Sequence, residues 1–298
     1  MRSFFISGVQ RSGTTLLATM LGKHPEIDLD GFSVAFRLIT CFRNYELVLP
    51  DNLEHSREAI LSWLIQNDYK GRLAQLLDYE HLDQYTNVRD LLRTSIQRRL
   101  DQQQKTVWGD KAPNLQHFAT DLFTLLPETK IIHIVRDGRA TANSFARRAY
   151  KNLYLSAQEW VDGNISGMVC QEWVGKEQLL IIHYEDLLQQ PETSIRSVCD
   201  FLGLPFHEAM LDLRQGSTPE QEAKQYVKSK FDLKKINQYQ TQLTPHQIRK
   251  IEQIQGPLLK KLGYTLQFEH SPKAFQQLSI GRRIWLNQKD NLRNLFRK

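Results

Sequence analysis

The chain has 298 residues, of which 41% are hydrophobic and 24% charged, and its formal net charge is +6. These values, without a low-complexity run or an internal repeat, predict a soluble globular protein with one large core. Its three cysteines, Cys41, Cys170 and Cys199, show no C-x-x-C spacing, which argues against a disulfide framework or a zinc site and favours free thiols in a reducing compartment. No apolar run reaches 18 residues, and Met1-Arg2 leads straight into the first predicted strand. We therefore expect a cytoplasmic protein.

The net charge is concentrated at the C-terminal end. From Ser271 onward the chain carries seven Lys and Arg residues and one acid, Asp290, so this tail supplies the whole +6. The balanced body argues against a nucleic-acid-binding protein. We divide the chain into a main domain, 1–270, and a basic helical tail, 271–298. The tail's apolar residues recur at helical spacing, which fits a helix docked on its own protein with a solvated basic face. It also fits an amphipathic helix on an anionic membrane surface or an acidic partner.

A glycine-rich turn follows the first predicted strand. Residues 4–17 read FFISGVQRSGTTLL, in which an apolar run leads into Gly8-x-x-x-x-Gly13 and then into a helical pattern. Phosphate-binding loops have this form, because their backbone N–H groups and the helix N-terminus bind phosphate oxygens. Thr14 stands where such a loop carries the lysine that reaches the β and γ phosphates, and the cation of this loop is Arg11. The pattern predicts a nucleotide whose reactive group is attached to a single 5′-phosphate.

The apolar runs predict a doubly wound sheet. Each strong run is followed by a polar turn and a helical pattern, which predicts an α/β fold: a P-loop-type parallel sheet flanked by helices, with helical insertions. The predicted strands are Phe4–Ser7, Thr106–Trp108, Ile131–Val135 and Leu179–His183, with a weaker one at Ile27–Leu29. The predicted helices lie at about 33–47, 56–102, 138–174, 192–202 and 245–262. Ligands of such sheets bind beyond the carboxyl ends of the strands.

The strand at Ile131–Val135 ends in Arg136, where a Walker B strand would carry an acid for Mg²⁺. Ser144 and Arg148 are four residues apart on the following helix and share a face. Together with Arg136 they can bind a second phosphate through charge-assisted hydrogen bonds. The alternative is that Arg136 pairs with Asp137 or a helix carbonyl, while Arg139, Arg147 and Arg148 form a solvated helix face.

Two other strands also end in informative residues. Lys111 lies in Gly109-Asp110-Lys111-Ala112-Pro113, and because the proline disfavours a helix at Ala112, the lysine is expected in a loop at the active edge. An ordinary surface lysine is the alternative. Tyr184 follows the last strand and either packs against a base or is structural.

Together these motifs resemble the sulfotransferases that use 3′-phosphoadenosine 5′-phosphosulfate (PAPS), and within them the tyrosylprotein and bacterial carbohydrate branch. The resemblance covers most of residues 3–266, in the family's order, and rests on GVQRSGTTLL, HPEI, GDKAP, IVRDGRA, HYEDLL and KKLGY. It implies that PAPS is the co-substrate, that Lys111 sits at the transferring sulfuryl group and that Tyr184 lies near the adenine. It also implies two phosphate sites: the 5′-phosphosulfate on Arg11, Ser12, Gly13, Thr14 and Thr15, and the 3′-phosphate on Arg136, Ser144 and Arg148.

Sulfuryl transfer agrees with this set of residues on chemical grounds. Negative charge grows on the leaving bisphosphate, and fixed cations and helix N–H groups can stabilise it. The sulfuryl group carries less charge than a γ-phosphoryl group, so we expect no metal ion. The resemblance fails at the general base, because the tyrosylprotein branch has a Gly-Glu segment where residues 28–33 read DLDGFS. Asp30 is the first candidate, followed by Asp28 and Asp110, and the expected acceptor is a hydroxyl of a glycan or small metabolite rather than peptide tyrosine.

Two other functions fit part of the pattern. A P-loop kinase or other NTPase would explain the loop, but Thr14 in place of lysine and Arg136 in place of an acid argue against it. A binding module that keeps the nucleotide cradle without catalysis, docked through the basic tail, would explain the loop and the tail.

Overall fold

The computed structural model describes residues 1–30, 76–77, 84–85, 88–149, 151–213 and 232–295. The predicted helix at about 33–47 and most of the one at about 56–102 lie outside the described residues, as does Cys41. Cys170 and Cys199 are free and buried, and burial raises the pKa of each thiol to about 11.

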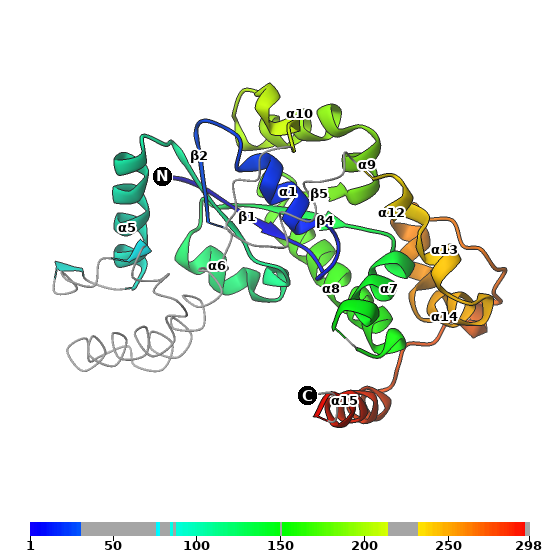
Figure 1. Ribbon diagram of the computed structural model, residues 1–298. Coiled ribbons are helices and arrows are strands. Elements are labelled where there is room, and N and C mark those ends of the chain that lie inside the picture. The colour runs from blue at the N-terminus through cyan, green and yellow to red at the C-terminus, as the bar shows by residue number, and fades with distance from the viewer. Residues whose placement is uncertain (31–75, 78–83, 86–87, 150, 214–231, 296–298) are drawn as a thin grey trace.

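Five parallel strands form the centre of the molecule, in the order β2-β3-β1-β4-β5 (Figure 1). They are β1 (Arg2–Ser7), β2 (Ile27–Asp30), β3 (Val107–Lys111), β4 (Lys130–Val135) and β5 (Leu179–His183). The central strands are buried on both faces, which is why each reads as a continuous apolar run and not as an alternating one. The predicted fold class, a parallel sheet flanked by helices, is confirmed.

Helices cover both faces of this sheet (Figure 1). On one face, Phe4, Ile6 and Ile132 pack with α1, α9 and α10. On the other, Phe5, Trp108 and Ile131 pack with α5, α6 and part of α8. The described helices are α1 (Thr14–Leu21), α5 (Val88–Gln103), α6 (Ala119–Leu125), α7 (Gly138–Ala149), α8 (Leu153–Val174), α9 (Tyr184–Gln189), α10 (Pro191–Leu202), α12 (Lys234–Asn237), α13 (Tyr239–Gln242), α14 (Pro245–Lys261) and α15 (Ile280–Leu295). Short 3-10 turns lie at Leu115–Phe118, Glu208–Leu211 and Pro272–Ala274.

The predicted helix at about 138–174 is two helices in the structure. Asn152 ends the continuity, because its side chain accepts hydrogen bonds from the backbone N–H groups of Tyr154 and Leu155 and so caps α8. The helix predicted at about 245–262 is confirmed, with a capping box between Thr244 and Gln247.

Among the described residues, no helix has both the length and the apolar character needed to cross a bilayer.

Candidate functional site

The turn between β1 and α1 has the backbone of an anion-binding loop. Three of its residues have positive φ: Gly8 at 147°, Arg11 at 73° and Gly13 at 104°. A Cβ on Gly8 would lie 2.6 Å from the carbonyl oxygen of Ile134, so this position requires glycine. The Ser12 hydroxyl is buried and has no hydrogen-bond partner among the described residues. The loop thus keeps, beside the N-terminus of α1, a buried polar group that no described residue satisfies.

Tyr184, the first residue of α9, packs against this loop at Gly13. A Cβ on Gly13 would lie 2.3 Å from its ring, and the guanidinium carbon of Arg136 lies 4.5 Å from the ring centroid. The ring is only 1% exposed. The ring therefore contacts both Gly13 and Arg136, and its exposure does not match that of an open platform for a base. The burial of this ring argues against the expected place of Tyr184 beside the adenine, which stays a prediction.

A pocket of about 220 Å³ opens beside the loop and collects the predicted basic residues. Arg11, Arg136, Ser144 and Arg148 all line it, and the Arg11 Nε donates a hydrogen bond of 3.3 Å to the Ser144 hydroxyl. No carboxylate is among the lining residues that the structure describes. The remaining lining residues are Ala140, Asn143, Arg147, Lys235, Gln238, Tyr239 and Gln242. We call this hollow the cationic pocket.

Arg136 connects the walls of the cationic pocket. Its Nη1 donates to the carbonyl of Arg11 at 3.2 Å and its Nη2 to the carbonyl of Lys235 at 2.7 Å. Its own carbonyl accepts from the indole N–H of Trp160 at 2.8 Å. The Nε is buried and has no hydrogen-bond partner among the described residues. The hydrogen-bond acceptors of this guanidinium in the described part of the chain are carbonyls, so its positive charge is available to an anionic ligand.

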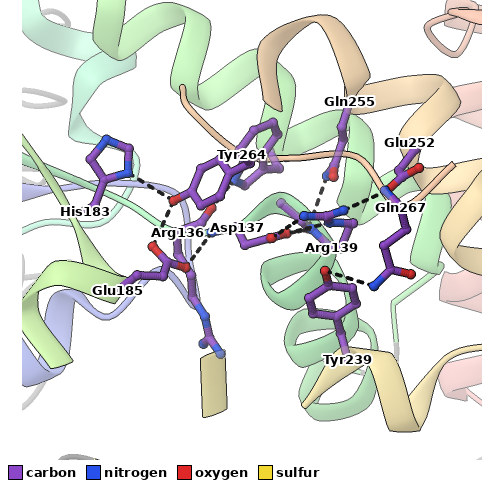
Figure 2. A network of polar contacts seen from close by, with 12 residues as sticks. Arg136, Asp137, Arg139, His183, Glu185, Tyr239, Glu252, Gln255, Tyr264 and Gln267 are labelled. Atoms are coloured by element: carbon purple, nitrogen blue, oxygen red, sulfur yellow. Dashed lines mark hydrogen bonds and ion pairs between the residues drawn. The ribbon is translucent and has the colours of Figure 1, made fainter. Parts of the chain in front are cut away.

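The alternative interpretation, in which Arg136 pairs with Asp137 and Arg139 lies on a solvated helix face, is wrong in both respects. Asp137 does not pair with Arg136, because its carboxylate is bound by two nitrogens of Arg139, at 3.0 and 2.7 Å. Arg139 is not on a solvated face, since it is 3% exposed. Its Nη1 also donates to Glu252 on α14 at 2.7 Å (Figure 2). Burial opposes the guanidinium charge, but the two carboxylates outweigh burial and raise the pKa of Arg139.

The same network extends to β5 and to the segment after α14 (Figure 2). Glu185 accepts the backbone N–H of Asp137 at 3.0 Å and the hydroxyl of Tyr264 at 2.8 Å, and that hydroxyl lies 3.1 Å from the Nδ1 of His183. Burial raises the pKa of Glu185, and burial beside Glu185 raises the pKa of Tyr264. Hydrogen bonds thus join three stretches distant in the sequence, around 137, 185 and 264, at the residue that follows Arg136.

Lys111 lies closer to the sheet than the sequence predicted. It is the last residue of β3, opposite Ile6 of β1, and not part of a loop. The next residues run along the phosphate loop, because the N–H of Ala112 donates to Ile6 at 3.0 Å and that of Asn114 to Gly8 at 2.9 Å. Lys111 is half-buried at the same sheet edge as the loop.

The three candidate bases have different environments. Asp28 is 7% exposed and its carboxylate is bound by two nitrogens of Arg99 on α5, so it is a structural ion pair. Asp110 is fully buried within β3. Asp30 is the last residue of β2 and lies opposite Asp110 in the register, at the carboxyl edge. Asp30 therefore remains the first candidate.

Sequence reasoning missed part of the cationic pocket. The sequence motifs do not single out Lys235, and Arg147 is predicted only on a solvated face. Asn143 lies next to Ser144 in the chain and donates to Gln242 of α13 at 2.7 Å. A signal for these residues exists only in three dimensions, since α12 and α13 reach α7 from about 90 residues away in the sequence.

Comparison with known proteins assigns the fold and the loop to one family. The sequence profile described as "Sulfotransferase family" matches residues 3–208, well over half of the chain. The chain belongs to the sulfotransferase family. The family and the enzyme class predicted from the motifs are thereby confirmed.

Among its sulfotransferase relatives, the protein-tyrosine sulfotransferase of Drosophila melanogaster is 24% identical over 277 residues, which cover 87% of this chain and 51% of the relative. The chain therefore spans about half the length of that relative. In structure it is similar to the sulfotransferase domain of the Synechococcus PCC 7002 olefin synthase (TM-score 0.57, 24% identity, 85% of this chain and 94% of that one). It is also similar to a mouse sulfotransferase complexed with PAP (TM-score 0.50, 15% identity, 87% and 85%). These structural likenesses establish the shared fold.

The expectation of a cytoplasmic protein is wrong on this comparison. Several relatives carry the name protein-tyrosine sulfotransferase, and enzymes of that name reside in the Golgi membrane. The free, buried cysteines and the start of the chain were too weak a basis for the cytoplasmic assignment.

Proposed function

We propose that this protein transfers a sulfuryl group from PAPS to an acceptor hydroxyl. The observation that carries the proposal is the cationic pocket beside the phosphate loop, in which Arg11, Arg136, Arg148 and Lys235 face a hollow without a carboxylate among its described lining residues. A donor with phosphates at both the 5′ and 3′ positions needs two anion sites, and the loop and the pocket are two such sites side by side. The mouse relative of the same fold is complexed with PAP, the product that this reaction leaves.

The residues present fit such a donor. The Ser12 hydroxyl and the Arg136 Nε are buried polar groups without a described partner, and each lies at one of the two anion sites. Buried polar groups are normally hydrogen-bonded, so an unpartnered pair next to a basic hollow favours an anionic ligand. Arg11 lines the pocket from the loop itself and so links the two sites.

Each predicted residue then has a role. The loop, with Arg11, Ser12, Gly13, Thr14 and Thr15, binds the 5′-phosphosulfate through backbone N–H groups and the α1 N-terminus. The 3′-phosphate is bound by Arg136, Ser144 and Arg148. We assign Tyr184 a positioning role, because its ring contacts both Gly13 and Arg136.

Catalysis in this proposal is electrostatic stabilisation of the leaving group. Negative charge develops on the 5′-phosphate oxygen as the bond to sulfur breaks, and we assign Arg11, the α1 N–H groups and Lys111 to its stabilisation. Asp30 accepts the proton of the acceptor hydroxyl as the bond between its oxygen and the sulfur forms. Holding the hydroxyl in line with the breaking bond supplies much of the remaining acceleration.

The acceptor we propose is a hydroxyl of a glycan or small metabolite, because residues 28–33 lack the glutamate of the tyrosylprotein branch. A protein tyrosine is the second candidate, and the names of several relatives favour it. Transfer of labelled sulfate from PAPS to a sugar, a phenol and a tyrosine peptide under the same conditions separates the two.

Substitution of Arg136 tests the donor. Arg136→Ala is expected to raise the Kd of 3′,5′-adenosine bisphosphate by roughly 10- to 100-fold, because a charge-assisted contact to phosphate is lost. Isothermal calorimetry measures this, and Arg196→Ala, an exposed arginine paired with Glu192 on α10, is the matched control that keeps wild-type affinity. Tighter binding of ATP or GTP than of the bisphosphate by the wild-type protein would contradict the proposal and favour an NTPase.

Substitution of Lys111 tests the transfer step. Lys111→Ala is expected to lower kcat by on the order of 10²-fold with little change in bisphosphate affinity, because the lysine acts on charge that develops in the transition state. Lys176→Ala, at an exposed position in the turn between α8 and β5, is the control with unchanged kcat. Normal turnover by the Lys111 variant would remove this lysine from the reacting centre, whereas bisphosphate binding without transfer in the wild type would favour a binding module.

A further inference from the structure

The tail helix α15 (Ile280–Leu295) has one face that is already occupied by the body of the protein. Leu286 is buried, and Asp290 accepts the backbone N–H of Asn152 at 2.5 Å. Arg283 donates to Asp162 of α8 at 2.8 Å. Figure 1 shows α15 at the periphery of the molecule, where it is reached from the rest of the chain by one connection. The helix is therefore docked through Arg283, Leu286 and Asp290, and its opposite face points outward.

The solvent-exposed part of α15 carries three large apolar side chains. Ile280 is 75% exposed, Ile284 54% and Trp285 56%. At 100° per residue, Ile284 and Trp285 lie on the half of the helix that faces away from Leu286 and Asp290, on either side of Gln288, and Ile280 lies next to Ile284 at the edge of that half. A docked helix usually presents charged and polar residues to solvent, so three exposed apolar side chains that include a tryptophan indicate a further contact.

Basic residues lie next to Trp285 on this exposed part of the helix. Arg282 and Lys289 are exposed, and the Lys289 Nζ lies 5.1 Å from the centroid of the Trp285 ring. The tail from Ser271 onward supplies the whole net charge of the chain. Tryptophan and isoleucine beside lysine and arginine suit a bilayer interface, where the rings and apolar chains enter the headgroup region and the cations meet anionic lipids.

We infer that α15 binds the surface of an anionic lipid bilayer through Ile280, Ile284 and Trp285. The three exposed side chains project from a single helix, whose outer surface is convex. Such a surface can enter lipid headgroups without shape complementarity, whereas the core of a protein interface needs it. The helix remains docked on α8 in this arrangement, so the whole domain is held at the membrane. The inference is independent of the sulfuryl-transfer proposal.

Vesicle flotation with the full chain tests this inference. The probe is vesicles of phosphatidylcholine alone and of phosphatidylcholine with phosphatidylserine, at low and high salt. We expect the wild-type protein to float with the phosphatidylserine vesicles at low salt, and binding to weaken at high salt because the Debye length shortens. Failure to float with the anionic vesicles overturns the inference, and so does equal binding to both kinds of vesicle.

Two pairs of substitutions separate the apolar from the charged contribution. Ile284→Ser with Trp285→Ser is expected to lower the partition coefficient by about tenfold or more, because two exposed apolar side chains lose their place in the interface. Arg282→Gln with Lys289→Gln is expected to abolish the preference for phosphatidylserine. The matched control is Ile165→Ser with Val169→Ser, which removes two exposed apolar side chains from α8 and leaves flotation unchanged.

Oligomeric state gives a second measurement on the same proteins. The substituted residues are exposed, so we expect the thermal midpoint and bisphosphate affinity of every variant to match the wild type. If the wild type is a dimer without lipid, and Ile284→Ser with Trp285→Ser makes it a monomer, this surface is covered by a second copy of the chain and the membrane inference is overturned.

Discussion

Replacement of Arg139 by methionine is expected to lower the free energy of unfolding by about 3–5 kcal/mol. The guanidinium is 3% exposed and neutralises both Asp137 and Glu252. Methionine keeps much of the volume but leaves two buried carboxylates without their cation. Glu252 would retain contacts to two backbone N–H groups and to His270, which do not replace the lost charge.

Urea denaturation followed by circular dichroism measures this loss. Arg196→Met is the control, because its ion pair with Glu192 is exposed and worth little. Adding Asp137→Asn and Glu252→Gln to Arg139→Met is expected to recover part of the stability, since the uncompensated charges are then gone. A loss no larger than that of the Arg196 control would show that the network is not a main source of stability.

Replacement of Asp30 by asparagine is expected to lower kcat by about 10²- to 10⁴-fold, the usual contribution of one general base. Asparagine is nearly the same size and cannot accept the proton of the acceptor hydroxyl. Bisphosphate affinity is expected to stay at the wild-type value, because Asp30 belongs to the acceptor side of the proposal. Steady-state transfer assays and calorimetry on the same protein measure both quantities.

Asp28→Asn is the matched control, two residues earlier on the same strand. It breaks the ion pair with Arg99, so it should cost about 1–3 kcal/mol of stability while kcat changes little. The opposite pattern, with Asp28→Asn inactive and Asp30→Asn active, would move the base to Asp28 and would require Arg99 to release it during the reaction.

The sheet could be predicted from the sequence because its strands are buried on both faces. Ile131–Val135 and Leu179–His183 read as apolar runs with one histidine each, and the structure places β4 and β5 there within one residue. The separation of α7 from α8 could not be predicted, because Asn152 is also compatible with a continuous helix. Its capping role depends on where the chain turns against α15, a contact between residues 138 positions apart.

The basic part of the site was predictable for a topological reason. Parallel strands bring their carboxyl ends to one edge, so the sequence predicts that Arg11, Lys111 and Arg136 lie near each other. The structure places Arg11 and Arg136 in one pocket, and Lys111 is not among its described lining residues. Arg139 was misread because its second partner, Glu252, is 113 residues away. No local pattern distinguishes an arginine that serves a buried ion pair from one on a solvated helix.

The hydrogen bonds of Arg136 couple ligand binding in the cationic pocket to the position of α12. Its guanidinium donates to the carbonyl of Arg11 in the loop and to the carbonyl of Lys235 in α12. An anion that binds this guanidinium weakens its hydrogen bonds to both carbonyls. Anion binding in the cationic pocket is therefore thermodynamically coupled to the position of α12. Because this coupling is reciprocal, any contact that fixes the position of α12 also changes the affinity for the nucleotide.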